Sequence, residues 1–164
     1  MTQQEYENKI KELQDELEQL KAAKIAGSEK RYKPVDKQIY WVVYDGADKV
    51  AEVNWVNSDF DNWNYLTGNC FKTEEEAEEY KKQIEYTARY KNYIEEHSEP
   101  LDWNDGSQMK YGAWFGFASK KVNIEQTAQG KQQGAIYASS KEIIEDAIEE
   151  IGEDNFKKYV LGVK

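Results

Sequence analysis

Cysteine and histidine are scarce in this sequence, and each scarcity narrows what the protein can be. The 164 residues include one cysteine, Cys70, and one histidine, His97. A single cysteine forms neither an internal disulfide nor a cysteine metal site, which favours a reducing cytoplasm. We interpret Cys70 as a small buried residue of a strand rather than a nucleophile. We interpret His97, beside several glutamates, as a solvated cation at a helix end rather than a metal ligand or general base.

Long apolar runs and positive charge are also lacking. No stretch approaches about 18 consecutive apolar residues and no signal-peptide core is present, so we expect neither a membrane span nor secretion by that route. The formal net charge is −10. Because duplex nucleic-acid binders gain affinity by neutralising phosphates, this charge argues against duplex nucleic acid as a partner. It argues equally against an anionic membrane surface.

Catalytic motifs are missing as well. The sequence contains no glycine-rich phosphate loop, no His-Glu-x-x-His and no Gly-x-Ser-x-Gly. Carboxylates are abundant, but they fall on predicted helix exteriors, where a charge run is normally a solvated face. A carboxylate pair for glycoside hydrolysis is not excluded, although nothing singles one out. We therefore predict a protein that is not an enzyme and that carries no metal or cofactor.

What the sequence does contain is a short heptad pattern and many aromatic residues. Over residues 1–27, Ile10 and Leu17 take one seam position, and Tyr6, Leu13 and Leu20 take the other, which predicts an N-terminal coiled-coil helix. Three heptads are marginal alone, so the helix would pair with a copy or pack on the domain; a frayed, solvated helix is the alternative. Residues 28–37 read as a linker.

Residues 38–164 predict an α+β domain, because aromatics make up 13% of the chain and strand patterns alternate with capped helices. Its first part is predicted as strands over 38–44 and 50–56, a polar loop over 57–65, a short strand over 69–72, and a helix over 74–97 that Thr73 caps and Glu76 closes in a capping box.

The second part repeats this plan. It is predicted as strands over 110–118, 121–127 and 134–138, then a helix over 141–151 with Ser139 as N-cap, Glu142 in the box and Gly152 as terminator. We therefore predict antiparallel β hairpins with capped helices in two similar ββ-β-α units, residues 38–97 and 108–151.

The best-supported binding residues lie on the long predicted helix. Lys82, Tyr86, Arg89 and Tyr93 follow the spacing i, i+4, i+7, i+11 and so share one face. A ligand with phosphates and bases suits this mixture, because a guanidinium binds oxygen pairs and rings stack on bases. The alternative is a rim of tyrosines that packs on the sheet and leaves its cations exposed.

Two further sets of residues are candidates. Asn69, Phe71, Lys72 and Thr73 lie where a strand end meets a helix N-terminus, a ready anion site and also a structural cap. The other set combines rings and amides near the second hairpin: Trp103, Asn104, Gln108, Lys110, Trp114 and Phe117. In that hairpin, either the face of Lys110, Gly112 and Trp114 or the face of Tyr111 and Phe115 must be buried, which leaves spare aromatic rings outside.

Several stretches together indicate a resemblance to known proteins. They are Tyr40-Trp41, the run Gly-Asn-Cys-Phe-Lys-Thr-Glu-Glu-Glu-Ala over 68–77, Asp102-Trp103, and Ile-Gly-Glu-Asp over 151–154. Over nearly its full length the chain resembles a family of small phage proteins. Within that group it is similar to the first described type of Thoeris anti-defence protein, a phage nucleotide sponge.

The resemblance implies a non-catalytic protein in the cytoplasm of an infected bacterial host. Such proteins bind the cyclised ADP-ribose messenger of the Thoeris system without cleaving it, and some members also hold cyclic oligonucleotides. They assemble as dimers or higher homo-oligomers, for example hexamers, with ligand pockets at subunit interfaces. The alternative hypothesis is an acidic coiled-coil module that blocks a host protein directly.

Family contacts come from arginines, aromatic rings and amides. Carried onto this chain, the resemblance implies ligand contacts by Arg89, Phe71 and Asn69, and further ones by Trp41, Asn92, Trp103 and Lys110. The chain departs from an arginine-rich pattern, since Arg89 is the one arginine of the domain.

Overall fold

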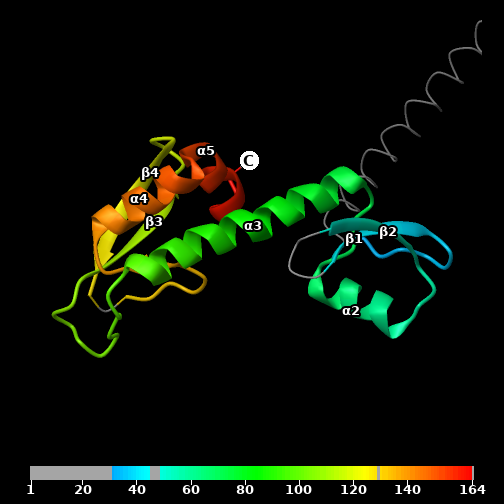
Figure 1. Ribbon diagram of the computed structural model, residues 1–164, viewed down its shortest axis with the longest axis horizontal. Helices are drawn as coiled ribbons and strands as arrows, with labels where there is room; N and C mark the ends of the chain where they lie inside the picture. Colours follow the sequence, from blue (N-terminus) through cyan, green and yellow to red (C-terminus); the bar gives the residue numbers. More distant parts are fainter. Residues whose placement is uncertain (1–30, 45–48, 129, 164) are drawn as a thin grey trace, which may run out of the picture.

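The architecture is organised along helix α3, and the other elements gather at its two ends in a computed structural model of the chain (Figure 1). The structure describes residues 31–44, 49–128 and 130–163, so the predicted coiled coil lies outside the described residues. The elements are β1 (Ile39–Tyr44), β2 (Lys49–Asn54), α2 (Asp59–Thr67), α3 (Glu74–His97), β3 (Lys110–Gly116), β4 (Lys121–Thr127), β5 (Tyr137–Ala138), α4 (Lys141–Ile151), α5 (Glu153–Asn155) and a π-helical turn η2 (Phe156–Val160). Two small antiparallel sheets accompany the helices, which confirms the predicted α+β class.

The first lobe consists of β1, β2, α2 and the start of α3. Strands β1 and β2 pair antiparallel, with α2 on one side of the hairpin and α3 on the other (Figure 1). Its core is small and aromatic: Tyr40, Val42, Trp55 and Cys70 are buried, and the Tyr40 and Trp55 rings meet edge to face at 5.7 Å. The short strand predicted over 69–72 is reduced to a single bridge between Trp41 and Phe71.

Helix α2 corrects the prediction of a polar loop over 57–65. Ser58 caps the helix by accepting from the Asp61 N–H, and the Asp61 carboxylate accepts in turn from the Ser58 N–H. The helix ends at Gly68, whose φ of 89° is a left-handed conformation that glycine adopts without strain. These caps hold a nine-residue helix that would be unstable in isolation.

Helix α3 has the bounds that the sequence predicts. The Thr73 hydroxyl accepts from the Glu76 N–H, which confirms the predicted cap. The Glu76 carboxylate accepts from the Lys72 N–H at 2.9 Å, one residue before the cap, rather than from the N–H of Thr73. His97 lies exposed in the last turn, with its ring stacked on Tyr93 at 4.1 Å.

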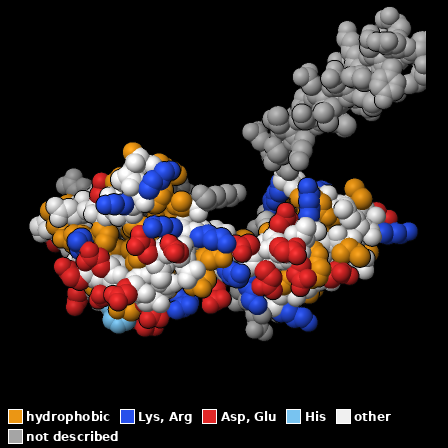
Figure 2. All heavy atoms as spheres, turned by 90° about the horizontal axis from the view of Figure 1, so that it is seen from above, with side chains coloured by type: hydrophobic (Ala, Val, Ile, Leu, Met, Phe, Trp, Pro, Cys, Tyr) orange, Lys and Arg blue, Asp and Glu red, His pale blue; other side chains and the backbone are white. Residues whose placement is uncertain are grey.

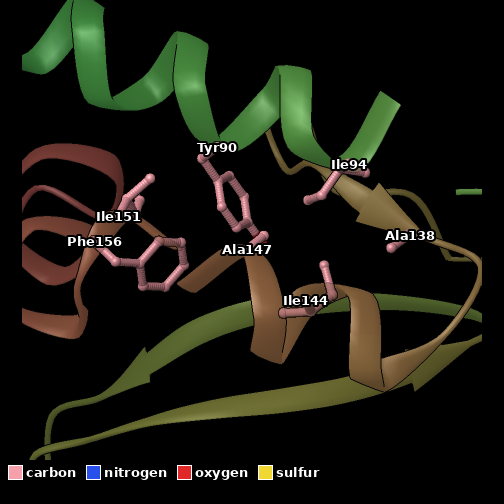
Figure 3. Close-up of a cluster of buried hydrophobic side chains, with 7 residues drawn as sticks. All are labelled: Tyr90, Ile94, Ala138, Ile144, Ala147, Ile151 and Phe156. Atoms are coloured by element: carbon pink, nitrogen blue, oxygen red, sulfur yellow. The ribbon is translucent and has the colours of Figure 1, made fainter. Parts of the chain in front are cut away.

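The second lobe packs helices on one face of a three-stranded sheet of order β4-β3-β5. Its core consists of apolar side chains from α3, α4, β5 and η2 (Figure 3): Tyr90, Ile94, Ala138, Ile144, Ala147, Ile151 and Phe156. Three of these residues follow the helical spacing on α4, so one stripe of that helix faces the core. The face of β3 that carries Tyr111 and Ala113 packs against this core, and the other face points outward.

The N-cap of α4 is Ser140, not the predicted Ser139. The Ser140 hydroxyl accepts from the Ile143 N–H, and Gly152 ends the helix as predicted. The Ser139 hydroxyl instead accepts from the Glu99 N–H at 3.0 Å, and its own N–H donates to Ser98. Ser139 therefore joins the end of α3 to β5, and the neighbouring serine performs the capping.

In each half, the segment before the capped helix pairs antiparallel with the first strand. Phe71 pairs with Trp41 in the first half, and Tyr137 pairs with Gly112 in the second. Helix α2 interrupts the first half and has no counterpart in the second among the described residues. The interpretation as two similar units therefore stays a prediction.

Candidate functional site

The predicted ligand residues fall into three separate places along the molecule. Those at the strand end and β1 lie in the first lobe, those of the helix lie on the second half of α3, and those of the hairpin lie at the far end of the second lobe. In that order they are Asn69, Phe71 and Trp41; Arg89 and Asn92; and Trp103 and Lys110. The two pockets described below do not bring the three groups together.

Asn69 uses its amide within the fold. Its Oδ1 accepts from the Val43 N–H and its Nδ2 donates to the Val43 carbonyl, both at 2.8 Å. Nδ2 also donates to Asn64 Oδ1 at 2.9 Å. The side chain thus pairs with β1 as a strand backbone would, and this structural task occupies its polar atoms.

The tyrosine face of α3 matches the alternative of a packed rim. Tyr86 stacks on Tyr159 with ring centroids 5.1 Å apart, and the Arg89 guanidinium lies 5.5 Å from the Tyr86 ring. Arg89 also forms an ion pair with Glu150 at 3.3 Å, while Asn92 is exposed. Both partners of that pair are largely solvated, so the guanidinium stays accessible to a ligand.

Lys110 is fully buried, which is rare for a lysine. Its ammonium donates to the carbonyls of Asp105, Gln108 and Ala128, at 3.0, 2.9 and 3.3 Å. These three bonds use all the donors of the ammonium. Lys110 therefore holds the loop before β3 in place, and only its positive charge acts on the surroundings.

A pocket of about 310 Å³ opens on the outward face of the second sheet. We call it the sheet pocket, and its walls include Gly112, Trp114, Gln126, Lys131, Gln132 and Tyr137. Trp114 is 42% exposed, so its indole is one of the spare rings that the sequence predicts for an outward face. This pocket collects rings, amides and an ammonium in one place.

Close packing fixes the Tyr137 wall of the sheet pocket. A Cβ atom on Gly112 would lie 3.0 Å from the Tyr137 ring, so the absence of a side chain lets the ring lie against β3. The Tyr137 hydroxyl accepts from the Gln132 N–H at 3.0 Å, and Trp103 meets the ring edge to face at 5.1 Å. Tyr137 thus joins the polar loop to the sheet and is held from both sides.

Positive charge gathers behind this wall. The ammonium groups of Lys131 and Lys110 lie 5.2 and 5.3 Å from the centroid of the Trp103 ring. Such contacts attract a cation to the ring face. Glu125 on β4 is the carboxylate of the pocket lining. The arrangement offers a planar ring surface with ammonium groups beside it, which suits a flat ligand that carries negative charge.

A larger groove, of about 980 Å³, runs between the start of α3 and the C-terminal segment, at the notch between the lobes in Figure 2. Phe71 lies in it, with its ring 5.1 Å from Tyr80. Four carboxylates and two lysines line it: Glu75, Glu76, Glu79, Asp154, Lys157 and Lys158. Both lysines are paired, Lys158 with Glu79 and Lys157 with Glu153, each at 2.6 Å. The groove is therefore acidic, which disfavours an anionic ligand there.

Features of reactive chemistry are sparse in the part of the chain that the structure describes. Those residues contain no group of three or more histidine, cysteine or carboxylate side chains that could hold a metal. Burial raises the pKa of the Cys70 thiol to about 11, so the thiol stays protonated and unreactive at neutral pH. Within the same residues, no helix is long and apolar enough to cross a bilayer.

Comparisons of the chain with protein-family models, with curated proteins and with solved structures give no match. Sequence reasoning named Trp114 but missed Lys131, Gln126 and Gln132. The signal that could have found the loop is the polar run between Gly130 and Gly134, which returns the chain from β4 to β5.

Proposed function

We propose that the chain is a phage anti-defence protein that binds a small cyclic nucleotide signal and sequesters it without cleaving it. The signal would be a cyclic ADP-ribose isomer of the Thoeris type or a cyclic oligonucleotide, as the resemblance implies. The observation that carries this proposal is the sheet pocket, where Trp114 and Tyr137 offer rings for stacking and Lys131 offers charge for a phosphate. Base stacking on aromatic side chains contributes about 1–3 kcal/mol per base.

We infer that a second subunit completes the pocket. Sequestration below an effector's threshold requires binding of nanomolar order, about 12 kcal/mol. A pocket of about 310 Å³ is at the small end of ligand sites, which usually bury most of the ligand surface. A homo-oligomer, dimeric or larger, would supply the missing wall.

The same proposal includes the architecture and the location of the protein. Residues 38–97 and 108–151 are two versions of one unit, and residues 1–27 form a coiled coil. The protein acts in the cytoplasm of the infected host.

Calorimetry with purified protein and cyclic ADP-ribose isomers or cyclic dinucleotides tests the function. After binding, the protein is denatured by heat, the ligand is recovered, and its molecular mass is measured by mass spectrometry. Intact ligand supports sequestration, and altered ligand indicates an enzyme. Absence of binding to any of these nucleotides contradicts the proposal and favours the alternative, an acidic module that blocks a host protein.

Two substitutions test whether the nucleotide binds in the sheet pocket. Trp114→Ala should weaken binding by about 5- to 150-fold, the equivalent of one stacked base. Lys131→Gln should weaken nucleotide binding more at low salt than at high salt, because salt screens the attraction between the ammonium and a phosphate. Phe117→Ala is the matched control, because Phe117 is an exposed ring on the same hairpin that does not line the sheet pocket. If Arg89→Ala loses nucleotide binding and Trp114→Ala retains it, the ligand binds on α3 and not in the sheet pocket.

A further inference from the structure

Helix α2 buries two polar side chains and exposes three apolar ones. Asp61 and Asn64 are 1% and 4% exposed, whereas Phe60, Trp63 and Leu66 are 42%, 67% and 70% exposed. A surface helix normally shows the opposite arrangement. In Figure 1 the helix lies on the side of the β1–β2 hairpin away from α3. The Phe60 ring stacks on Tyr44 of β1 at 5.6 Å, so Trp63 and Leu66 are the more exposed part of the outer face.

Hydrogen bonds on the inner side hold α2 in this orientation. Asp61 accepts from the Tyr40 hydroxyl at 2.7 Å and from the Val56 N–H at 3.0 Å. Asn64 accepts from the Asn69 amide at 2.9 Å. Turning the apolar residues inward would break these bonds and leave the buried Tyr40 hydroxyl without its acceptor, which is costly. The outward position of Trp63 is therefore built into the fold.

The outer face carries an apolar ridge. Phe60, Trp63 and Leu66 are spaced i, i+3, i+6 along α2, and Val56, 62% exposed, lies three residues before the first residue of the helix. Exposed apolar surface of this kind marks an interaction site, and tryptophan is prominent among residues that dominate binding energy. The ridge carries no charge along its middle.

We propose that this ridge binds the same ridge of a second copy of the chain, with the two α2 helices antiparallel about a twofold axis. Charge supports this orientation, because the ends of the helix are opposite in sign. Asp59 is the exposed charge in the first turn, and the Arg31 guanidinium donates to the Leu66 carbonyl at the last turn, at 3.2 Å. Antiparallel packing places Asp59 of each copy near Arg31 of the other, and every contact occurs twice.

Charge favours a copy over another protein. The chain carries a net charge of −10, so two copies repel over most of their surface, and an uncharged ridge with Asp59 and Arg31 at its opposite ends is a place where they can meet. The ridge supplies the centre of an interface whose standard size is about 800 Å² per partner.

The test measures the mass of the full chain in solution by light scattering and sedimentation. We expect a dimer for the natural sequence and a weakening of about 30-fold or more for Trp63→Glu, the loss typical of a dominant interface residue. Phe117→Glu is the matched control, since Phe117 is 73% exposed but lies in the second lobe. This variant should dimerise normally. Asp59→Lys should weaken the dimer, and more so at low salt.

A monomeric natural chain at high micromolar concentration would overturn the proposal and leave the ridge to a different protein. Unchanged dimerisation of Trp63→Glu, or equal loss in Phe117→Glu, would also overturn it. Circular dichroism confirms that each variant is folded, and Leu66→Glu replaces Trp63→Glu if that variant fails to fold. The proposal does not rest on nucleotide binding, because a chain that binds no nucleotide can still dimerise.

Discussion

At the scale of single residues, a buried carboxylate organises the first lobe. Asp61 accepts bonds from the Tyr40 hydroxyl, from the Ser58 hydroxyl and N–H, and from the Val56 N–H. Burial alone would raise the pKa of Asp61, but these hydrogen bonds outweigh burial and hold the pKa below its usual value. A depressed pKa contributes stability above the unfolded value, about 4, and this stability is lost as the pH falls through the folded value.

Asp61→Asn should lower the free energy of unfolding by about 2–3 kcal/mol at pH 7, because charge-assisted bonds are lost. At pH 3 the difference from the natural protein should be smaller, because below about pH 4 the unfolded chain binds a proton at Asp61 that the folded chain, with its lowered pKa, resists. Urea denaturation at both pH values measures this. Asp59→Asn, at an exposed position, is the control, and a difference as large at pH 3 as at pH 7 would contradict the account.

Two buried tyrosines make a matched pair. Tyr40 donates its hydroxyl to Asp61 at 2.7 Å, whereas the Tyr90 hydroxyl is buried without a hydrogen-bond partner among the described residues. Tyr90→Phe should therefore raise the free energy of unfolding by about 1 kcal/mol, and Tyr40→Phe should lower it by about 2 kcal/mol. Chemical denaturation of the two variants gives both values. Equal destabilisation would indicate that the Tyr90 hydroxyl does have a partner.

At the scale of elements, two of the caps were readable from the sequence, whereas the burial of polar residues in α2 was not. Thr73 before a glutamate-rich turn predicted the start of α3, and Gly152 predicted the end of α4, because local hydrogen bonds determine both. Helix α2 escaped prediction because its buried positions are polar and its apolar ridge faces outward. The same limit applies to the site: a lysine is normally a surface cation, so nothing in the sequence marks Lys110 as buried. The sheet pocket depends on a strand, a hairpin and a loop brought together only by the fold.

The contribution of the Ser140 cap to stability can be measured. Ser140→Ala should cost about 1 kcal/mol of stability, because the Ile143 N–H loses its acceptor. Ser140→Asp should retain the natural stability, since aspartate caps equally well. Thermal unfolding followed by circular dichroism distinguishes the two variants. If Ser140→Ala unfolds like the natural protein, the cap contributes nothing.

At the scale of the whole molecule, each lobe has its own hydrophobic cluster, and helix α3 contributes Tyr90 and Ile94 to that of the second lobe. The cluster around Tyr40 and Trp55 and the cluster around Tyr90 and Phe156 have no buried residue in common. On the face shown in Figure 2, acidic and basic side chains are interspersed over both lobes rather than gathered into one basic surface. The lobes should therefore open independently, each with its own stability.

Phe156→Ala should test this independence. The side chain is fully buried, and its removal should cost about 3–5 kcal/mol in the second lobe. Hydrogen exchange should quicken in α4 and in the second half of α3, and the amides of β1 should exchange as before. Equal acceleration in β1 would indicate that α3 makes the two lobes one cooperative unit. Phe117→Ala, at an exposed ring, serves as the control.

The pairing of Asn69 and Phe71 with β1 has a consequence for solubility. A strand whose outer edge is open can recruit the strand of another molecule, the first step toward amyloid-like aggregation. Here the edge of β1 opposite β2 is already used, at Trp41 by the backbone of Phe71 and at Val43 by the amide of Asn69. A short side chain thus takes the place that an intruding strand would need. The first lobe can therefore expose an apolar helix for association while the β1 edge of its sheet stays closed to intermolecular strand addition.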